Sequence, residues 1–233
     1  VNGNDLTPTA NFTAAYNALA TQLSANGRKG VVANLPYVTA LPYFTAVPFN
    51  PVPLNAATAT QLNSGYAQYN GGLALAQNAG LITAAERTRR TITFAAGQNA
   101  VVMVDSYLTN LSALGLPSLR QATSADLLVL PSRSIIGTTV GGNPAQINGV
   151  SVPLEDKWVL SSDEVAEVKA ATDAYNLVIQ AAATTNNLAF VDAKSVMDQL
   201  STTGLNFDTY NMTSTYVTGG AFSLDGVHPS ARG

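Results

Sequence analysis

Two residues that can share a proton lie close together near the end of the sequence. Asp225 and His228 are three residues apart in the segment 223–230 (SLDGVHPS), and His228 is the only histidine of the chain. In a turn with Gly and Pro, the carboxylate can accept a hydrogen bond from one imidazole nitrogen, which leaves the other nitrogen free to act as a base. The pair predicts the acid and base of a Ser-His-Asp triad. The alternative is a surface histidine in an aspartate-stabilised turn.

The first residues carry a second group suited to the same chemistry. Residues 1–6 read VNGNDL, which places Asn4 after a short lead and before Asp5 and Leu6. This stretch resembles the third sequence block of the SGNH (GDSL-type) hydrolases, and DGVHP at 225–229 resembles their fifth and last block. The resemblance implies that Asn4 donates a side-chain N–H to an oxyanion hole and that Asp225 and His228 complete the triad with a serine. It also implies ester hydrolysis on an α/β scaffold.

The chain departs from that family at its beginning. The family places the nucleophilic serine of its first block, and the backbone-donating glycine of its second, before the asparagine. Only Val1, Asn2 and Gly3 precede Asn4, and Asn2 stands where the family usually has glycine. We therefore expect this sequence to be a fragment of a longer protein, cut at both ends. As given, we expect it to be inactive because it lacks the nucleophile.

A stiff aromatic segment follows the second predicted strand. Residues 36–55 contain five prolines, which exclude a regular helix or a central strand. Tyr37, Tyr43, Phe44 and Phe49 are interleaved with them. We predict that these rings line an apolar pocket for the acyl or alcohol group of a small-molecule or lipid ester. The alternative is that they only pack the loop onto the domain.

The elements that must position these residues follow an α/β pattern. Residues 1–5 read as the end of a strand, apolar residues recur at helical spacing from Phe12 to Leu23, and 31–35 is a short apolar strand. A second helix is expected over 56–78. A capping box at Ser161 predicts the clearest helix, which leads to a strand at 188–192 and a short helix at 194–200. The expected fold is a three-layer α/β/α, flavodoxin-like open parallel sheet, incomplete at both ends.

We expect one domain over 1–233 with an insertion at about 85–155 that is partly β-hairpin. Residues 100–105 and 125–131 are strand candidates, and Asn148-Gly149 between β-branched residues is a hairpin signal. Trp158 is expected to anchor the insertion to the core. The arginines of RTRR at 87–90 are interpreted as a solvated helix face.

Composition narrows the possible functions. A hydrophobic fraction of 46% favours a packed globule, while a net charge of −3 without a long basic run argues against a nucleic-acid partner. With no cysteine and one histidine we expect no transition-metal site, and we expect no cofactor. No apolar run approaches the roughly 20 residues that span a bilayer. The low lysine content favours an exported bacterial protein. Two non-catalytic alternatives remain, namely a surface or adhesion module and a lipid- or glycan-binding module that uses residues 36–55. The oligomeric state is not predicted.

Overall fold

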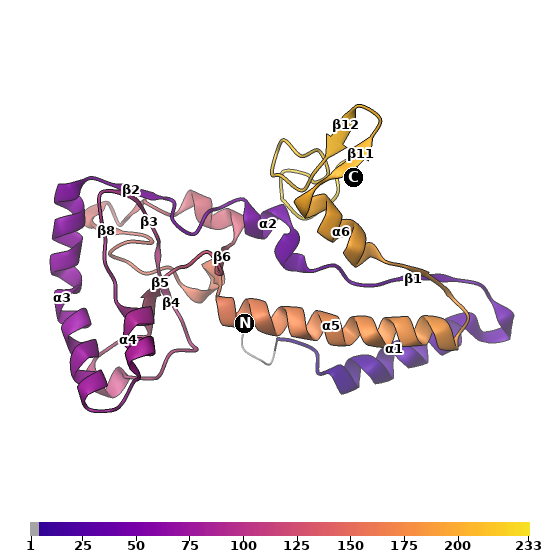
Figure 1. Cartoon of the computed structure of the whole chain (residues 1–233), viewed down its shortest axis with the longest axis horizontal. Helices are drawn as coiled ribbons and strands as arrows, with labels where there is room; N and C mark the ends of the chain where they lie inside the picture. The colour runs from indigo at the N-terminus through magenta and orange to yellow at the C-terminus, as the bar shows by residue number, and fades with distance from the viewer. Residues whose placement is uncertain (1–4) are drawn as a thin grey trace. The chain divides into compact units, whose positions relative to one another are not determined.

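The computed structural model describes residues 5–233, and the chain divides into two compact units. The first unit comprises the residues up to Ala46 together with Glu164–Gly233, and the second is Val47–Asp163. The predicted insertion at 85–155 falls inside the second unit. Helix and strand are mixed, with 44% and 20% of the residues respectively, so the chain is broadly α/β (Figure 1).

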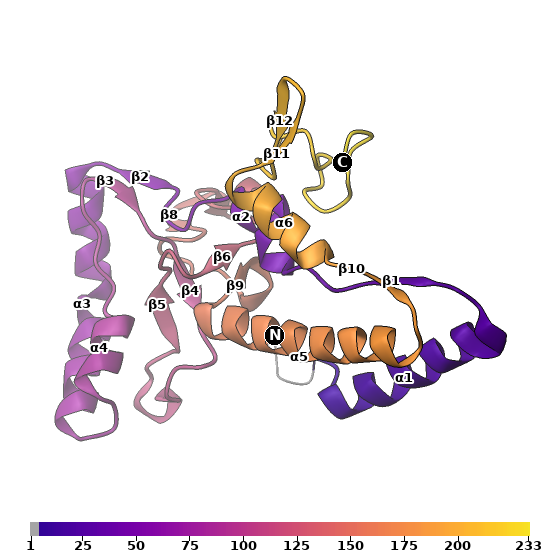
Figure 2. The ribbon, with the colours of Figure 1, turned by 45° about the vertical axis from the view of Figure 1, so that its right-hand side comes forward.

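The first unit contains a parallel strand pair flanked by helices. β1 (Val31–Ala33) pairs with β10 (Ala189–Val191) in parallel, with Val31 opposite Ala189. The chain reaches β10 through α5 (Ser162–Thr185), whose first two residues belong to the second unit. Parallel strands need such a crossover. Figures 1 and 2 both show β1 and β10 side by side.

Helices α1 and α5 begin and end close to the predicted points. α1 (Thr9–Ser24) is followed by a 3₁₀ turn, Ala25–Gly27, in which Gly27 has φ 75°. α5 ends where Asn187 adopts φ 51° and Leu188 N–H donates to the Ala183 carbonyl at 2.9 Å. A residue with positive φ and a bond back to the last turn are the usual end of a helix. Phe12 of α1 stacks on Tyr175 of α5, with 4.4 Å between ring centroids.

Polar side chains fix the carboxyl ends of β1 and β10. The Asn34 amide N–H donates to Asp192 Oδ1 at 2.7 Å, and the Lys194 backbone N–H donates to Asn34 Oδ1 at 2.8 Å. Asp192 also accepts the Ser195 N–H at 3.0 Å and so caps α6 (Ala193–Thr202). Asp192 is a second aspartate that could orient His228, but its carboxylate is engaged by Asn34 and the helix.

A second small core joins the last part of the chain to the segment after β1. The antiparallel hairpin of β11 (Leu205–Phe207) and β12 (Tyr210–Met212) follows α6. The buried side chains of this core are Met197, Leu200, Met212 and Ala221, and Ala40, Leu41, Leu205 and Phe222 pack against them. Leu41 comes just before α2 (Pro42–Thr45), a single helical turn that starts at proline. This core therefore fixes α2 close to the segment that carries Asp225.

The second unit is built from two helices and antiparallel strand pairs. α3 (Ala56–Asn78) and α4 (Ala84–Arg90) are its helices. The pairs are β2 (Val52–Leu54) with β3 (Gly97–Asn99), β4 (Val102–Val104) with β5 (Leu119–Gln121), β6 (Leu127–Leu128) with β9 (Val159–Leu160), and β7 (Thr139–Val140) with β8 (Asn143–Ile147). Short 3₁₀ turns lie at Val38–Ala40 in the first unit and at Ser112–Leu114, Leu130–Ser134 and Asp156–Trp158 in the second. Trp158 packs against the core of the second unit, as expected.

The prediction of a hairpin at Asn148-Gly149 was wrong. A turn forms there, since the Val150 N–H donates to the Ile147 carbonyl at 3.1 Å, but the segment after it does not pair with β8; the hairpin is β7 with β8, and its turn is Gly141-Gly142. Both glycines have positive φ, 58° and 76°, which a two-residue turn joining twisted strands requires.

The arginines of α4 form a solvated face only in part, because Arg87 and Arg89 are exposed and Arg90 is not. Arg90 is fully buried and donates to the carbonyls of Thr109 and Pro117 at 2.8 and 2.9 Å. Arg89 pairs with Asp105 at 2.9 Å and also with Asp163. Arg120 is buried as well, and its guanidinium contacts Asp105 at 2.5 Å and Asp126 at 2.6 Å. Burial alone raises the pKa of Asp126, but the donors of Arg120 and Thr123 outweigh it and lower that pKa.

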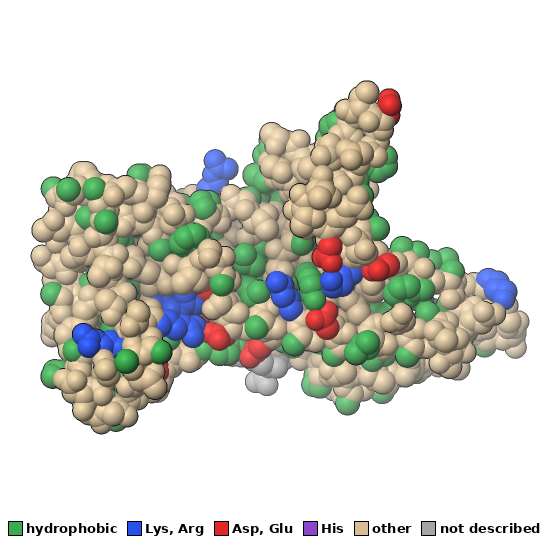
Figure 3. All heavy atoms as spheres, in the orientation of Figure 1, with side chains coloured by type: hydrophobic (Ala, Val, Ile, Leu, Met, Phe, Trp, Pro, Cys, Tyr) green, Lys and Arg blue, Asp and Glu red, His purple; other side chains and the backbone are tan. Residues whose placement is uncertain are grey.

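Within the described part of the chain, every sheet has two strands. No helix among these residues has the length and apolar character needed to cross a membrane. Charged side chains are sparse on the face shown in Figure 3, as the charged fraction of 11% requires.

Candidate functional site

The segment 222–229 folds into a tight turn that carries both predicted residues. Phe222 and Pro229 form an antiparallel bridge at its base. The Ser223 N–H donates to the His228 carbonyl at 2.8 Å, which closes the turn. Gly226 at its tip has φ 72°, a conformation that L-residues adopt only with strain. The local sequence therefore dictates a compact loop in which Asp225 and His228 face the same side.

The Asp225 carboxylate divides its two oxygens between the turn and the histidine. Oδ1 accepts the Ser223 hydroxyl at 2.6 Å and the backbone N–H groups of Val227 and His228 at 2.9 and 3.0 Å. Oδ2 lies 2.6 Å from His228 Nδ1. The first set holds the carboxylate fixed, so the second contact orients the imidazole. This is the arrangement that the D-x-x-H spacing predicted.

These contacts decide the ionisation of the carboxyl group. The Ser223 hydroxyl, the Val227 N–H and the His228 ring all favour the charged form and hold the pKa of Asp225 well below its usual range. An ionised carboxylate can only accept, so the proton between Oδ2 and Nδ1 belongs to the imidazole. In the neutral ring Nε2 is then an acceptor, and no described residue bonds it. The geometry therefore provides a base at Nε2.

The pair is open to solvent. The side chain of His228 is 80% exposed and that of Asp225 is 49% exposed. A water-excluding site strengthens catalytic electrostatics. Within the described residues the pair is an oriented base on a surface turn, without the cover that a closed active site has.

The short helix α2 contacts the tip of this turn through its backbone. The Tyr43 N–H donates to the Gly226 carbonyl at 3.0 Å. A Cβ on Gly226 would lie 2.6 Å from Tyr43 N and 3.0 Å from Tyr43 Cα. Glycine is therefore required at 226 for two reasons, its positive φ and the close approach of the α2 backbone.

The predicted pocket residues separate into different surroundings. Tyr43 and Phe44 lie on α2 next to the turn, their rings edge to face at 5.0 Å between centroids. Tyr37 instead donates its hydroxyl to Asp173 at 2.7 Å, with Lys194 Nζ 4.2 Å from its ring centroid. That hydrogen bond, followed by burial, raises the pKa of Tyr37. Phe49 packs against the core of the second unit. All four rings are half-buried.

Asn4, the predicted oxyanion donor, lies outside the described residues. Its role stays a prediction.

Comparisons with family models, curated proteins and solved structures found no match to this chain.

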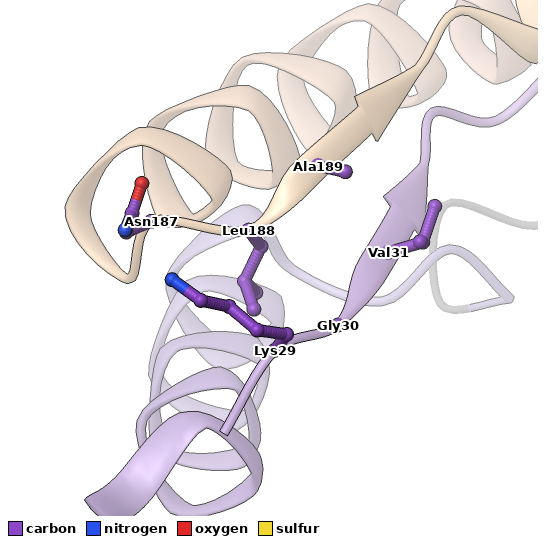
Figure 4. Close-up of a pocket in the computed structure, with 6 residues that line it drawn as sticks. All are labelled: Lys29, Gly30, Val31, Asn187, Leu188 and Ala189. Carbon is purple, nitrogen blue, oxygen red and sulfur yellow. The ribbon is translucent and has the colours of Figure 1, made fainter. Parts of the chain in front are cut away.

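A cavity of about 570 Å³ lies where β1 and β10 begin. Figure 4 shows the Leu188 side chain pointing toward Gly30 and Lys29. Ligands of parallel sheets bind at the carboxyl ends of the strands, and this cavity lies at the opposite ends. Among the described residues no cluster of three or more His, Cys, Asp or Glu side chains could hold a metal ion.

Two residues of the site were missed in the sequence. Ser223 donates its hydroxyl to Asp225; the usual Asp-turn pattern concerns the backbone N–H two residues after the aspartate, here Val227, and does not indicate a serine before it. Tyr43 was noted for its ring, whereas its backbone N–H makes the contact. No local pattern indicates that contact, because the two segments lie far apart in the sequence.

Proposed function

We propose that this chain carries the acid and base of an SGNH-type serine ester hydrolase. The observation that supports the proposal best is the 2.6 Å contact from Asp225 Oδ2 to His228 Nδ1, made by a carboxylate whose other oxygen is held by three donors. Such a pair orients the ring and stabilises the imidazolium that forms during acyl transfer. The D-x-x-H spacing and the Asn4 segment at the front of the chain match the order of the family's blocks.

In this proposal each residue has one task. His228 Nε2 takes the proton of a serine hydroxyl that attacks the ester carbonyl, and later returns a proton to the leaving alcohol. Asp225 keeps the Nδ1 tautomer and stabilises the imidazolium. The Asn4 side chain donates to the oxyanion, a contribution of roughly 3 kcal/mol for one donor. In the family that the sequence resembles, the nucleophilic serine comes ahead of the asparagine of the oxyanion hole.

We propose further that β1 and β10 belong to a larger open parallel sheet of the flavodoxin-like type. Sheets made of parallel strands are normally covered on both faces. Val31, Phe190 and Val191 are 67%, 38% and 45% exposed. This exposed apolar surface on the strand pair supports the proposal that further strands or helices cover it in a larger sheet.

The substrate is an ester of a small molecule or a lipid. Tyr43 and Phe44 are the two predicted pocket residues that lie beside the turn, and in this proposal they contact the acyl or alcohol group. In the protein extended upstream of Val1, Tyr43→Ala with Phe44→Ala is expected to change the preference among p-nitrophenyl esters of different chain length. Loss of folding without a change in preference would assign both rings to packing alone.

The catalytic proposal is tested by hydrolysis of p-nitrophenyl acetate by the same extended protein. Asp225→Asn removes the charge that orients His228 and is expected to lower kcat by about 1,000-fold or more. Asp208→Asn is the matched control, because Asp208 is an exposed aspartate in another turn of the first unit. Equal activity of the two variants would remove Asp225 from catalysis. The chain as given is expected to show no hydrolysis above background.

A second candidate is a non-catalytic surface, lipid-binding or glycan-binding module on the same scaffold. The 80% exposure of the His228 side chain favours it, because a catalytic imidazole normally works in a site that excludes water. Binding of a ligand without turnover by the extended protein, together with the absence of a Gly-Asp-Ser turn upstream, would decide for this candidate.

A further inference from the structure

A cavity of about 610 Å³ in the first unit is lined by five residues that carry a hydroxyl group and by two alanines. The five polar lining residues are Thr45, Ser201, Ser214, Thr215 and Tyr216. None of the described residues that line it carries a charge. The volume lies within the range of roughly 300–1,000 Å³ that is typical of small-molecule sites.

One hydrogen bond from a wall residue, and one from the short helix that carries another wall residue, lead from this cavity to the Asp225–His228 turn. The Tyr216 hydroxyl donates to the Leu224 carbonyl at 2.8 Å, immediately before Asp225. Thr45 is the last residue of α2, whose Tyr43 N–H donates to the Gly226 carbonyl, immediately after Asp225. The cavity is therefore anchored to the backbone on both sides of the proposed catalytic carboxylate.

The chemistry of the lining selects the ligand class. The hydroxyl protons of Ser201 and Tyr216 are already donated to the carbonyls of Asp198 and Leu224, but a hydroxyl oxygen can still accept, so these groups match a ligand that donates from hydroxyl groups of its own. An anionic headgroup would lack a Lys or Arg partner in this lining. An acyl chain would leave hydroxyl groups such as that of Ser214, a residue only 8% exposed, without water.

We infer that this cavity binds a neutral, polyhydroxylated group, either a saccharide or a glycerol unit, next to the Asp225–His228 turn. The identification of this group as the alcohol part of an ester substrate rests on the proposed function. The binding itself needs neither the serine nor Asn4. It can therefore be measured on the chain as given.

The test is saturation-transfer NMR on this chain with five probes. Xylobiose and cellobiose represent saccharides, glycerol represents a glycerolipid headgroup, and glucose 6-phosphate and octanoate represent the anionic and apolar alternatives. Ser201→Trp is expected to fill the cavity. Thr202→Trp is its matched control, because both residues are exposed on α6 and both hydroxyls bond the Asp198 carbonyl, at 3.1 and 2.8 Å, while only Ser201 lines the cavity.

We expect a signal from a disaccharide or from glycerol that Ser201→Trp lowers at least tenfold and Thr202→Trp preserves. A disaccharide signal identifies a saccharide site, and a signal from glycerol alone identifies a glycerol site. Absence of both signals, equal loss in the two variants, or stronger binding of octanoate or glucose 6-phosphate would overturn the assignment. Ester hydrolysis by the extended protein, together with no binding of a disaccharide or glycerol to the cavity, would also overturn the cavity assignment. Binding with no hydrolysis would instead contradict the proposed function and leave the cavity assignment in place.

Discussion

Gly226→Ala tests whether the backbone of α2 rests on the Asp225–His228 turn. Gly226 has φ 72°, and a Cβ there would lie 2.6 Å from the backbone nitrogen of Tyr43. The substitution adds left-handed strain of about 1–2 kcal/mol, offset in part by the lower entropy of the unfolded chain. It also pushes away the Tyr43 N–H that donates to the Gly226 carbonyl, which costs about 1 kcal/mol. We expect a total loss of about 2–3 kcal/mol in the free energy of unfolding.

Gly27→Ala provides the matched control for backbone strain. Gly27 has φ 75°, almost the same as Gly226, but a Cβ added there would have no atom within 4 Å. Its cost is therefore the strain alone, about 1 kcal/mol after the entropy offset. The difference of about 1–2 kcal/mol between the two variants measures the approach of α2 to the turn.

Two measurements check this prediction. Chemical denaturation gives the two losses of stability, and amide hydrogen exchange of Tyr43 reports its bond to Gly226 directly. Gly226→Ala is expected to accelerate exchange at Tyr43, while Gly27→Ala leaves it unchanged. Equal costs and equal exchange in the two variants would show that α2 does not rest on the turn, and the geometry of the site would have to be revised.

Three further predictions concern other contacts of known geometry. Arg120→Met leaves Asp105 and Asp126 as buried carboxylates without their main partner. Chemical denaturation should show that the free energy of unfolding of the second unit falls by about 3–5 kcal/mol. Arg133→Met, at an exposed arginine, is the control and should change that free energy by less than about 0.5 kcal/mol. Asn34→Ala removes the side chain that donates to Asp192 and accepts from the Lys194 N–H. Chemical denaturation should show that the free energy of unfolding of the first unit falls by about 1 kcal/mol. An unchanged free energy of unfolding would contradict this prediction. The pKa of Asp225 is lowered in the folded chain, so the ionised carboxylate stabilises the turn above the pKa of an unfolded aspartate, about 3.9, and this stabilisation is lost only as the pH falls below that value. NMR titration should show that the carboxylate is ionised at about pH 4. Ser223→Ala removes one donor and should raise the pKa of Asp225.

The sequence predicts the local features of this chain well. α1, α3 and α5 follow from apolar periodicity and from the serine before α5, and a short helix was expected at 194–200, within α6. The pairing of Asp225 with His228 follows from a spacing of three residues, because one turn fixes both side chains. The exclusion of long regular elements from 36–55 also holds, since only the 3₁₀ turn Val38–Ala40, the single helical turn that starts at Pro42 and the three-residue β2 form there.

Contacts between distant segments could not be predicted in this way. Tyr37 was expected to line a pocket, but Asp173, which is 136 residues away, accepts its hydroxyl. Arg90 was expected in solvent, yet carbonyl groups of the loop after β4 provide it with buried acceptors. The contact of α2 with Gly226 is of the same kind, because it involves backbone atoms that no side-chain pattern encodes.

Covalent labelling of the extended protein with a fluorophosphonate tests the central proposal most directly. If His228 is the base of a serine hydrolase, the reagent should modify one serine ahead of Asn4, and His228→Ala should slow that reaction by at least about 100-fold. Mass spectrometry of the labelled peptide identifies the site. Labelling that is absent, or that proceeds equally fast in His228→Ala, would contradict the assignment of the Asp225–His228 pair to ester hydrolysis.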